Sequence, residues 1–216
     1  MNIEQARFNM IEQQIRPWNV GDQEVLALLA LVKREDFFPE SQKSLAFFDT
    51  ELPLPGGAHA LNPKIEARIV QAVAVKNNES VLVIGAGSGY LAALLAHQAR
   101  QVTVMEVNPE LKAMAEENLR QNGLTNVDVQ CCDALKINHA AGFDVIVVSG
   151  SLESLPEQLQ QQLTNGGRLF VIVGKAPVME AQLITRESEL FFNTSNLFET
   201  SVQRLSQAAP LSTFTF

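Results

Sequence analysis

The stretch Val81-Leu82-Val83-Ile84-Gly85-Ala86-Gly87-Ser88-Gly89-Tyr90 decides the fold of this chain. Four apolar residues typical of a buried strand run directly into a glycine loop, and residues 91–96 behind the loop read as a helix. This order of strand, glycine turn and helix is how an α/β protein brings a cofactor close to bare backbone. The three glycines favour that approach because they carry no Cβ atom. Their spacing is G-x-G-x-G, and Tyr90 stands where a dinucleotide fingerprint has its third glycine.

Two acidic residues follow at the ends of the next two expected strands. The β-branched run 102–105 leads into Glu106, which lies 17 residues after Gly89. An acidic side chain at the carboxyl end of the second strand can accept both hydroxyl protons of a ribose. Asp133 comes after the alternating stretch 127–131, although a solvated loop carboxylate would explain this residue taken alone. The glycine loop and the two acids together predict an adenosine-containing ligand.

Length and composition indicate an ordinary globular protein. At 216 residues the chain suits one domain, or one domain with an elaborated terminus. It is 46% hydrophobic and 19% charged, which excludes a disordered protein. Sixteen basic and 24 acidic residues give a net charge of −8, and the basic residues form no cluster. We therefore expect neither nucleic acid nor an anionic membrane as a partner.

The sequence also predicts the cellular compartment. No apolar run approaches the roughly 20 residues of a membrane-spanning helix, and the polar N-terminus lacks the apolar core of a signal peptide. Cys131 and Cys132 are adjacent and cannot form a disulfide framework. We expect a cytoplasmic protein with reduced thiols. No metal site is expected, because no ligand spacing surrounds any of the three histidines, His59, His97 and His139.

The chain divides into three parts within one expected domain, 1–216. Residues 1–78 read as helices and loops, residues 79–185 alternate strand and helix, and residues 186–216 read as elements at one edge of a sheet. Repeated β-α units predict an α/β fold, with a mostly parallel sheet and helices on both faces. Patchy alternation in the tail from Met179 suggests that the edge strands are antiparallel.

The first part contains three expected helices and one long loop. Asp22 is a candidate cap for the second helix. Loop 52–63 contains three prolines and two glycines, which forbid regular structure; it either connects elements or closes over a ligand. The expected core faces of the helices are Phe8, Ile11 and Ile15, in a helix that stops near Pro17; Val25, Leu28, Leu29 and Val32; and Ile65, Ile69 and Val73.

The second part continues with further strand and helix signals. Asn108 and Pro109 are a cap and a first-turn proline for a helix that Gly123 ends. The elements expected after it are a buried strand over 143–148, a helix over 155–163, a turn at Gly166-Gly167 and a strand over 168–173. Ser149 and Ser151 would lie just past the first of these strands, at the cofactor cleft, where turn chemistry is their simplest role.

With these residues in place, the chain resembles the protein-L-isoaspartate O-methyltransferase family of class I S-adenosylmethionine-dependent methyltransferases, over nearly its whole length. Residues 32–39 resemble the family segment V-P-R-E-x-F-V-P, and residues 48–54 resemble Y-x-D-x-P-L-P-I. Residues 81–90 resemble V-L-E-I-G-T-G-S-G-Y, and residues 166–169 resemble G-G-R-L.

The resemblance implies a Rossmann-like methyltransferase fold, S-adenosylmethionine as cofactor, and a protein or peptide substrate methylated on the carboxylate of isoaspartyl residues. Loop 52–63 would be the substrate loop. Glu106 would take the ribose hydroxyls, and Asp133 would lie near the adenine amino group. The methionine and ribose part of the cofactor would contact the loop residues Gly85, Ala86, Gly87, Ser88 and Gly89.

Two positions depart from the family pattern. The family loop reads G-x-G-Q-T-I-S-Q-P, and its threonine and serine belong to the active site. In this chain His59 stands at the threonine position and Leu61 at the serine position. Val83 replaces a strand acid that helps to hold the cationic methionine end of the cofactor. The first departure concerns the substrate, and the second concerns cofactor affinity.

Methyl transfer to a carboxylate makes limited demands on the protein. The acceptor is ionised at neutral pH and needs no general base, so the task is to position it and to remove water from it. Leu61 cannot donate the hydrogen bond that a serine would. His59 and Asn62 are the candidate catalytic donors, and the alternative for His59 is a solvent-facing loop residue.

Other functions remain open from the sequence. A family member that has lost isoaspartyl activity, and acts as a regulator or on another substrate, would fit Leu61 and Val83. A nicotinamide dehydrogenase would need a glycine where Tyr90 stands, and it would need a histidine placed for hydride transfer. The oligomeric state is not indicated.

Overall fold

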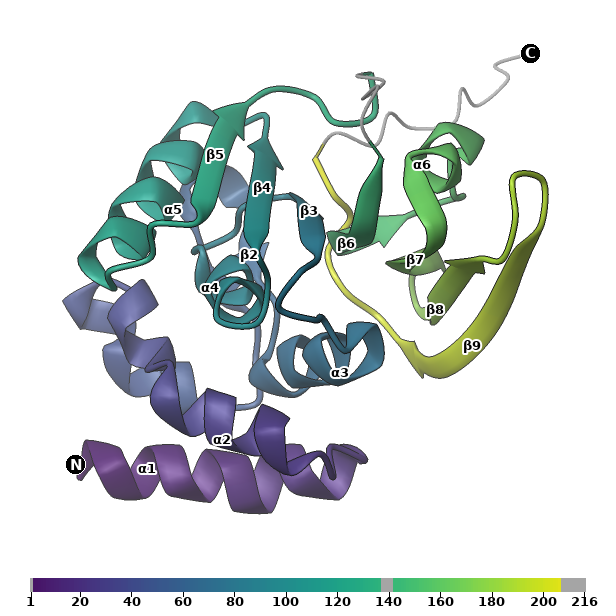
Figure 1. The fold of residues 1–216 in the computed structure, drawn as a ribbon. Coiled ribbons are helices and arrows are strands. Elements are labelled where there is room, and N and C mark those ends of the chain that lie inside the picture. The colour runs from purple at the N-terminus through teal and green to yellow at the C-terminus, as the bar shows by residue number, and fades with distance from the viewer. Residues whose placement is uncertain (1, 137–141, 207–216) are drawn as a thin grey trace, which may run out of the picture.

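The computed structural model describes residues 2–136 and 142–206, so His139 and the end of the C-terminal part 186–216 lie outside the described residues. Within them, a sheet of seven strands has the order β5-β4-β3-β6-β7-β8-β9 (Figure 1). The first five strands in this order are parallel, whereas β8 and β9 are antiparallel additions. This confirms the expected mostly parallel sheet with an antiparallel C-terminal edge. The strands are β3 (Ser80–Ile84), β4 (Gln101–Glu106), β5 (Val127–Cys131), β6 (Phe143–Leu152), β7 (Leu163–Lys175), β8 (Val178–Arg186) and β9 (Phe192–Thr200).

Helices cover both faces of the sheet, as expected. Val83 and Val147 belong to one hydrophobic cluster with α3, α4 and α5, whereas Ile84 and Val148 belong to a second cluster with Leu159 of α6. The strands read as continuous apolar runs because both of their faces are covered. The helices are α1 (Ile3–Asn9), α2 (Gln23–Leu31), α3 (Pro63–Val73), α4 (Tyr90–Ala96), α5 (Pro109–Gln121) and α6 (Glu157–Gln161).

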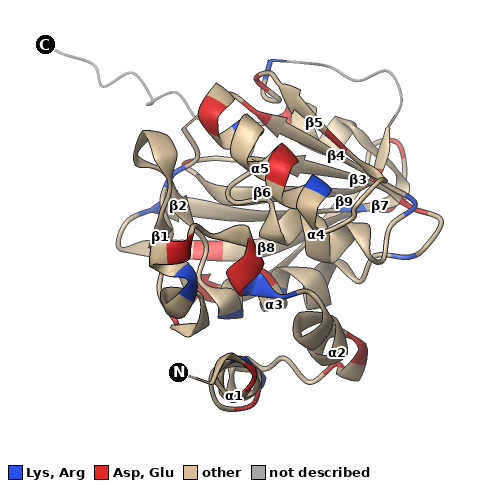
Figure 2. Cartoon of the chain, turned by 90° about the vertical axis from the view of Figure 1, so that its left-hand side faces the viewer, with Lys and Arg blue, Asp and Glu red and all other residues tan. Residues whose placement is uncertain are grey.

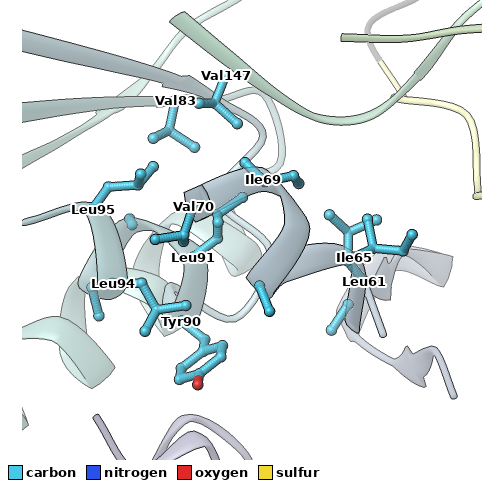
Figure 3. Packing of buried hydrophobic residues seen from close by; sticks show 14 of the residues in the cluster. Leu61, Ile65, Ile69, Val70, Val83, Tyr90, Leu91, Leu94, Leu95 and Val147 are labelled. Atoms are coloured by element: carbon cyan, nitrogen blue, oxygen red, sulfur yellow. The ribbon is translucent and has the colours of Figure 1, made fainter. Parts of the chain in front are cut away.

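The packing between the glycine-loop strand and α3 positions the rest of the site. Val83 of β3 pairs with Val147 of β6 across the parallel ladder. Figure 3 shows these two side chains facing Ile69 and Val70 of α3 and Leu95 of α4. All five are fully buried or nearly so. The contact fixes α3, and the loop before it, against the strand that leads into the glycines.

The N-terminal helix differs from its prediction. It ends near Pro17 as expected, but it changes from α1 to a π-helical stretch, Met10–Ile15, and then to a 3-10 turn, Arg16–Trp18. Phe8 was assigned wrongly to the core, because its side chain is 58% exposed. The inward position belongs instead to Arg7, which forms a buried ion pair with Glu35. A charged residue with a buried partner thus occupies a core position that the apolar pattern gave to its neighbour.

The other two N-terminal helices follow their predictions. The Asp22 side chain caps α2 by accepting the N–H groups of Glu24 and Val25. The core positions expected for these two helices are all buried, namely Val25, Leu28, Leu29, Val32, Ile65, Ile69 and Val73. In Figure 1, α1 and α2 lie on the far side of α3 from the sheet and form an outer layer.

The loop 52–63 is more regular than expected. β1 (Leu52–Pro53) pairs antiparallel with β2 (His59–Ala60), and a 3-10 turn, Pro55–Gly57, connects them. The expectation of no regular structure was wrong because the prolines and glycines occupy the turn and its edges. Gly56 and Gly57 have φ values of +69° and +76°, which glycine adopts without strain.

Three boundaries in the second half also differ from prediction. β6 continues to Leu152, so Ser149 and Ser151 lie within the strand rather than past it. The helix expected over 155–163 is shortened to α6, and β7 already begins at Leu163. The expected Gly166-Gly167 turn is an irregularity inside β7, where the register shifts between the pairs Phe143–Leu163 and Val145–Arg168.

Three expectations from the sequence, on membrane helices, basic clusters and metal sites, concern the described residues. None of the helices in the described part of the chain has both the length and the hydrophobicity that a membrane crossing requires. Lysine and arginine positions are interspersed with aspartate and glutamate positions along the helices (Figure 2). Residues 2–136 and 142–206 contain no group of three or more potential metal ligands.

Candidate functional site

A cavity lies where the carboxyl ends of β3, β4 and β6 meet. Open α/β sheets bind their ligands at this edge. The cavity brings together five residues that are far apart in the sequence: His59, Gly85, Glu106, Ser149 and Leu205. The structure therefore places the glycine loop, the second-strand acid and part of loop 52–63 at one site.

The glycine loop requires its glycines for different reasons. Gly85, Gly87 and Gly89 have φ values of +92°, +54° and +89°. A Cβ on Gly85 would lie 2.4 Å from Ser149 Oγ, and a Cβ on Gly89 would lie 3.2 Å from the Ala115 carbonyl. A Cβ on Gly87 would meet no atom within 4 Å. Gly87 is thus the position where the backbone faces open space. Ala86 and Ser88 between the glycines are buried.

Glu106 binds the glycine loop directly. Its Oε2 accepts the Ala86 N–H at 2.8 Å, and its Oε1 accepts the Asn108 N–H at 2.8 Å. The residue is only 5% exposed, so it is a buried carboxylate with a backbone donor on each oxygen. The sequence places this acid at a strand end but does not show the two backbone donors that surround it. Each carboxylate oxygen keeps a second lone pair, so both can still accept a ligand hydroxyl.

Asp133 does not line this cavity. It follows β5, where its Oδ1 accepts the Leu135 N–H at 3.1 Å and its Oδ2 pairs with Lys136 Nζ at 2.9 Å. These contacts describe a local turn stabilised by the aspartate side chain. The predicted contact of Asp133 with an adenine amino group stays a prediction.

The two candidate catalytic residues have different surroundings. His59 is exposed at the cavity, and its Nδ1 lies 3.1 Å from Gln203 Oε1. Asn62 instead caps α3 by accepting the Ile65 N–H at 3.1 Å, and it does not line the cavity. Leu61 lies between them and is 6% exposed, with its side chain at the cavity wall. His59 is therefore the better placed of the two donors.

The segment 202–206 is part of the site and was missed from the sequence. Ser151 donates its N–H to the Gln203 carbonyl at 3.0 Å, and the Leu205 N–H donates to the Ser151 carbonyl at 2.9 Å. The Leu205 side chain approaches Gly85, so the segment runs along the wall of the cavity. No local signal could have shown this, because the pairing joins residues about 50 positions apart.

A buried ion pair beside the loop was also missed. Arg34 is fully buried and its Nε donates to Glu66 Oε2 at 2.8 Å. Its other two nitrogens donate to the carbonyls of Ala46 and Leu61, each at 2.7 Å. Burial raises the pKa of the Glu66 carboxyl, while the charge and hydrogen bond of Arg34 oppose that shift. Arg34 thereby fixes the backbone of Leu61, which is at the cavity wall.

A second, smaller cavity adjoins the first. The two share four lining residues: His59, Leu61, Gly87 and Ser149. The smaller cavity additionally reaches Glu66 on α3 and Tyr90 at the start of α4. A ligand that lies along the glycine loop would therefore have space on the side of β4 and on the side of α3.

Known proteins share this fold and much of this sequence. A sequence model described as protein-L-isoaspartate(D-aspartate) O-methyltransferase matches residues 5–202. A protein-L-isoaspartate O-methyltransferase 2 from an Anaeromyxobacter species is 40% identical over 182 residues, which is 84% of this chain and 74% of that protein. A protein of the same name from Marinobacter nauticus is 39% identical over 190 residues, which is 87% of each chain.

A solved structure has the same arrangement of elements. It is a proposed protein-L-isoaspartate O-methyltransferase from Plasmodium falciparum, in complex with S-adenosyl-L-homocysteine. Its TM-score is 0.82, and the match covers 93% of this chain and 98% of that chain. The two sequences are 20% identical, so this similarity concerns the fold.

Proposed function

Because the chain belongs to the protein-L-isoaspartate(D-aspartate) O-methyltransferase family, we propose that it transfers the methyl group of S-adenosylmethionine to the carboxylate of isoaspartyl residues in protein substrates. The observation that carries this proposal is the match of the family over residues 5–202. It supports an active methyltransferase, rather than a family member that has lost the reaction or a nicotinamide dehydrogenase.

The residues at the larger cavity fit the cofactor. Gly87 leaves open space where any other residue would place a Cβ. Glu106 keeps acceptor capacity for two ribose hydroxyls although it already accepts two backbone N–H groups. Gly85, Ala86, Ser88 and Gly89 would hold the methionine and ribose part through the loop backbone.

The chemistry asks the protein for positioning and for exclusion of water. When bound, S-adenosylmethionine supplies a methyl group that its sulfonium already activates. The carboxylate acceptor is ionised, so no residue has to remove a proton. Leu61 excludes water from one wall. His59 Nδ1 donates to Gln203 Oε1, and the Nε2–H of the imidazolium form donates a hydrogen bond to the acceptor.

Ser149 has a structural part in this site. Its hydroxyl has one proton to donate and lies 3.0 Å from the Ile84 carbonyl oxygen and 2.7 Å from the Gly85 carbonyl oxygen. The hydroxyl therefore holds the end of β3 and the first glycine against β6. With its proton engaged there, Ser149 is not a donor to the acceptor carboxylate.

A methylation assay tests the proposal. The protein is incubated with labelled S-adenosylmethionine and a short isoaspartyl peptide, with the aspartyl peptide of the same sequence as control. We expect label in the isoaspartyl peptide only. Absence of label transfer, from a protein that binds the cofactor in calorimetry, would exclude isoaspartyl residues as the acceptor.

A further inference from the structure

Glu66 is a buried carboxylate that reaches the smaller cavity. It lies in the first turn of α3 and is 3% exposed. Among the described residues that line the smaller cavity, it is the one that carries a negative charge: His59, Ala60, Leu61, Glu66, Ala86, Gly87, Ser88, Tyr90, Leu91 and Ser149. A burial this deep is costly for a carboxylate unless its charge is balanced.

Arg34 provides that balance but uses only one carboxylate oxygen. Its Nε donates to Oε2, while its other nitrogens are directed to the carbonyls of Ala46 and Leu61. The hydrogen bonds among the described residues leave Oε1 of Glu66 without a donor. An ionised carboxylate can accept about four hydrogen bonds, so this oxygen has capacity for a ligand.

The strand beneath the cavity supplies no charge of its own. The side chains of β3 from Val81 to Ile84 are apolar and buried, and Val83 belongs to the same buried cluster as Ile69 of α3 (Figure 3). A cationic group that lies against the glycine loop within the smaller cavity therefore finds its negative partner on α3. Glu66 is on the same helix as Ile69, one turn earlier, and on the side that meets the loop.

We propose that Glu66 binds the α-ammonium group at the methionine end of S-adenosylmethionine, through Oε1, and so replaces the negative charge that Val83 does not provide. This inference rests on the proposed function, because it takes the cofactor to be S-adenosylmethionine. Attraction between opposite charges is strong here because the site is largely shielded from water. Arg34 keeps Glu66 oriented through Oε2, while the ligand ammonium takes the other oxygen and brings a second positive charge to the carboxyl.

Two ligands separate this contact from the rest of the cofactor site. S-adenosylhomocysteine contains the amino-acid end, whereas 5′-methylthioadenosine contains the adenosine and the thioether but no ammonium. Calorimetric titration of both ligands into wild type and Glu66→Gln gives the effect on each. We expect Glu66→Gln to weaken the binding of S-adenosylhomocysteine at least about tenfold, since one charge-assisted hydrogen bond is lost. The affinity for 5′-methylthioadenosine should stay within about twofold of the wild-type value.

A matched control comes from the second buried ion pair. Glu35→Gln makes the same substitution opposite Arg7, away from both cavities. It is expected to lower the melting temperature without changing the ratio of the two affinities. If Glu66→Gln does not fold, Glu66→Asp keeps the charge and withdraws the carboxylate by one methylene. This variant is expected to weaken the binding of S-adenosylhomocysteine but not that of 5′-methylthioadenosine.

The other outcomes overturn the inference. If Glu66→Gln weakened the binding of both ligands equally, Glu66 would only support the glycine loop. Unchanged affinity for S-adenosylhomocysteine in a folded Glu66→Gln protein would place the ammonium elsewhere, while leaving the proposed function intact. A wild-type protein that binds neither ligand would overturn the proposed function together with this inference.

Discussion

Glu106 at the end of β4 accepts the backbone N–H of Ala86 in the glycine loop, with an Oε2–N distance of 2.8 Å. The same carboxylate accepts the Asn108 N–H, which lies just before α5. One side chain therefore connects the ends of two adjacent strands and the start of a helix. A residue expected to bind only a ligand also maintains the shape of the loop that the ligand would contact.

This double role predicts that Glu106→Ala lowers both affinity and stability. Loss of the ribose contacts should weaken the binding of S-adenosylhomocysteine at least about tenfold. The Ala86 and Asn108 N–H groups lose their acceptor, which should cost about 1–3 kcal/mol of unfolding free energy. Calorimetric titration and thermal melting of the same preparations measure the two effects.

Glu106→Gln is the control for the Glu106 prediction. Its amide oxygen can still accept one of the backbone N–H groups, so we expect stability between those of wild type and Glu106→Ala. An unchanged dissociation constant in a folded Glu106→Ala protein would mean that the ribose lies elsewhere.

Gly85 and Gly87 are predicted to respond differently to alanine. Gly85→Ala places a Cβ 2.4 Å from Ser149 Oγ and 2.8 Å from Leu205 Cδ1, at a φ of +92°, so it should lose about 1–3 kcal/mol of stability. Gly87→Ala meets no atom within 4 Å and costs only the left-handed conformation, roughly 1 kcal/mol. We expect its main effect on cofactor affinity, because the new methyl group enters the cavity. Equal melting temperatures for the two variants would contradict this explanation.

His59→Ala should separate substrate contacts from cofactor contacts. His59 lies at the cavity with Nδ1 directed to Gln203, and its other ring nitrogen, Nε2, is the donor proposed for the acceptor carboxylate. The affinity for S-adenosylhomocysteine should stay nearly unchanged, whereas the turnover of isoaspartyl peptide should fall. His97→Ala, at the end of α4 and outside both cavities, is the control that should retain full turnover. Unaltered turnover in His59→Ala would leave His59 as a solvent-facing loop residue.

We expect the Glu79 carboxylate to account for part of the loss of folding stability in acid. Burial by itself would raise its pKa, but hydrogen bonds from Arg168 and the Lys76 backbone, together with their charges, bring the pKa below its usual value. Both carboxylate oxygens accept from Arg168, at 2.9 and 2.8 Å. Because the pKa of Glu79 is lowered in the folded state, the stability that this carboxylate contributes is fully present above the unfolded pKa of about 4.3. It is lost as the pH falls through the folded pKa.

Glu79→Gln should therefore lower stability at neutral pH, by about 1–3 kcal/mol, and should reduce the loss of stability on acidification. Urea unfolding at pH 7 and at pH 3 measures the difference. Glu117→Gln is the comparison on an exposed helix face, where the pKa of the carboxyl is lowered to about 2 by hydrogen bonds from Arg120 and Gln121. If both variants gave the same pH dependence, the half-buried position of Glu79 would have no special importance.

The sequence was sufficient for the architecture and for the principal ligand-facing loop. The run 81–90 predicted a buried strand, a glycine loop and a helix, and the structure has β3, the loop and α4 in this order. The caps at Asp22 and Asn108 were predicted correctly as well. These features are local: the period of apolar side chains, the conformational freedom of glycine and the hydrogen bonds of a cap all act within a few residues.

Tertiary structure decided which residues share the cavity and which polar groups are buried. Segment 202–206 reaches the loop only through pairing with Ser151, and Asp133 is directed into its own turn. Arg34 and Glu66 are 32 positions apart, and neither has a local reason to be buried. Their burial depends on the partner that the fold supplies, because a buried charge is tolerated only where an opposite charge and hydrogen bonds meet it. The sequence determined the sheet and the glycine loop, whereas long-range packing determined the charges and the walls that surround the loop.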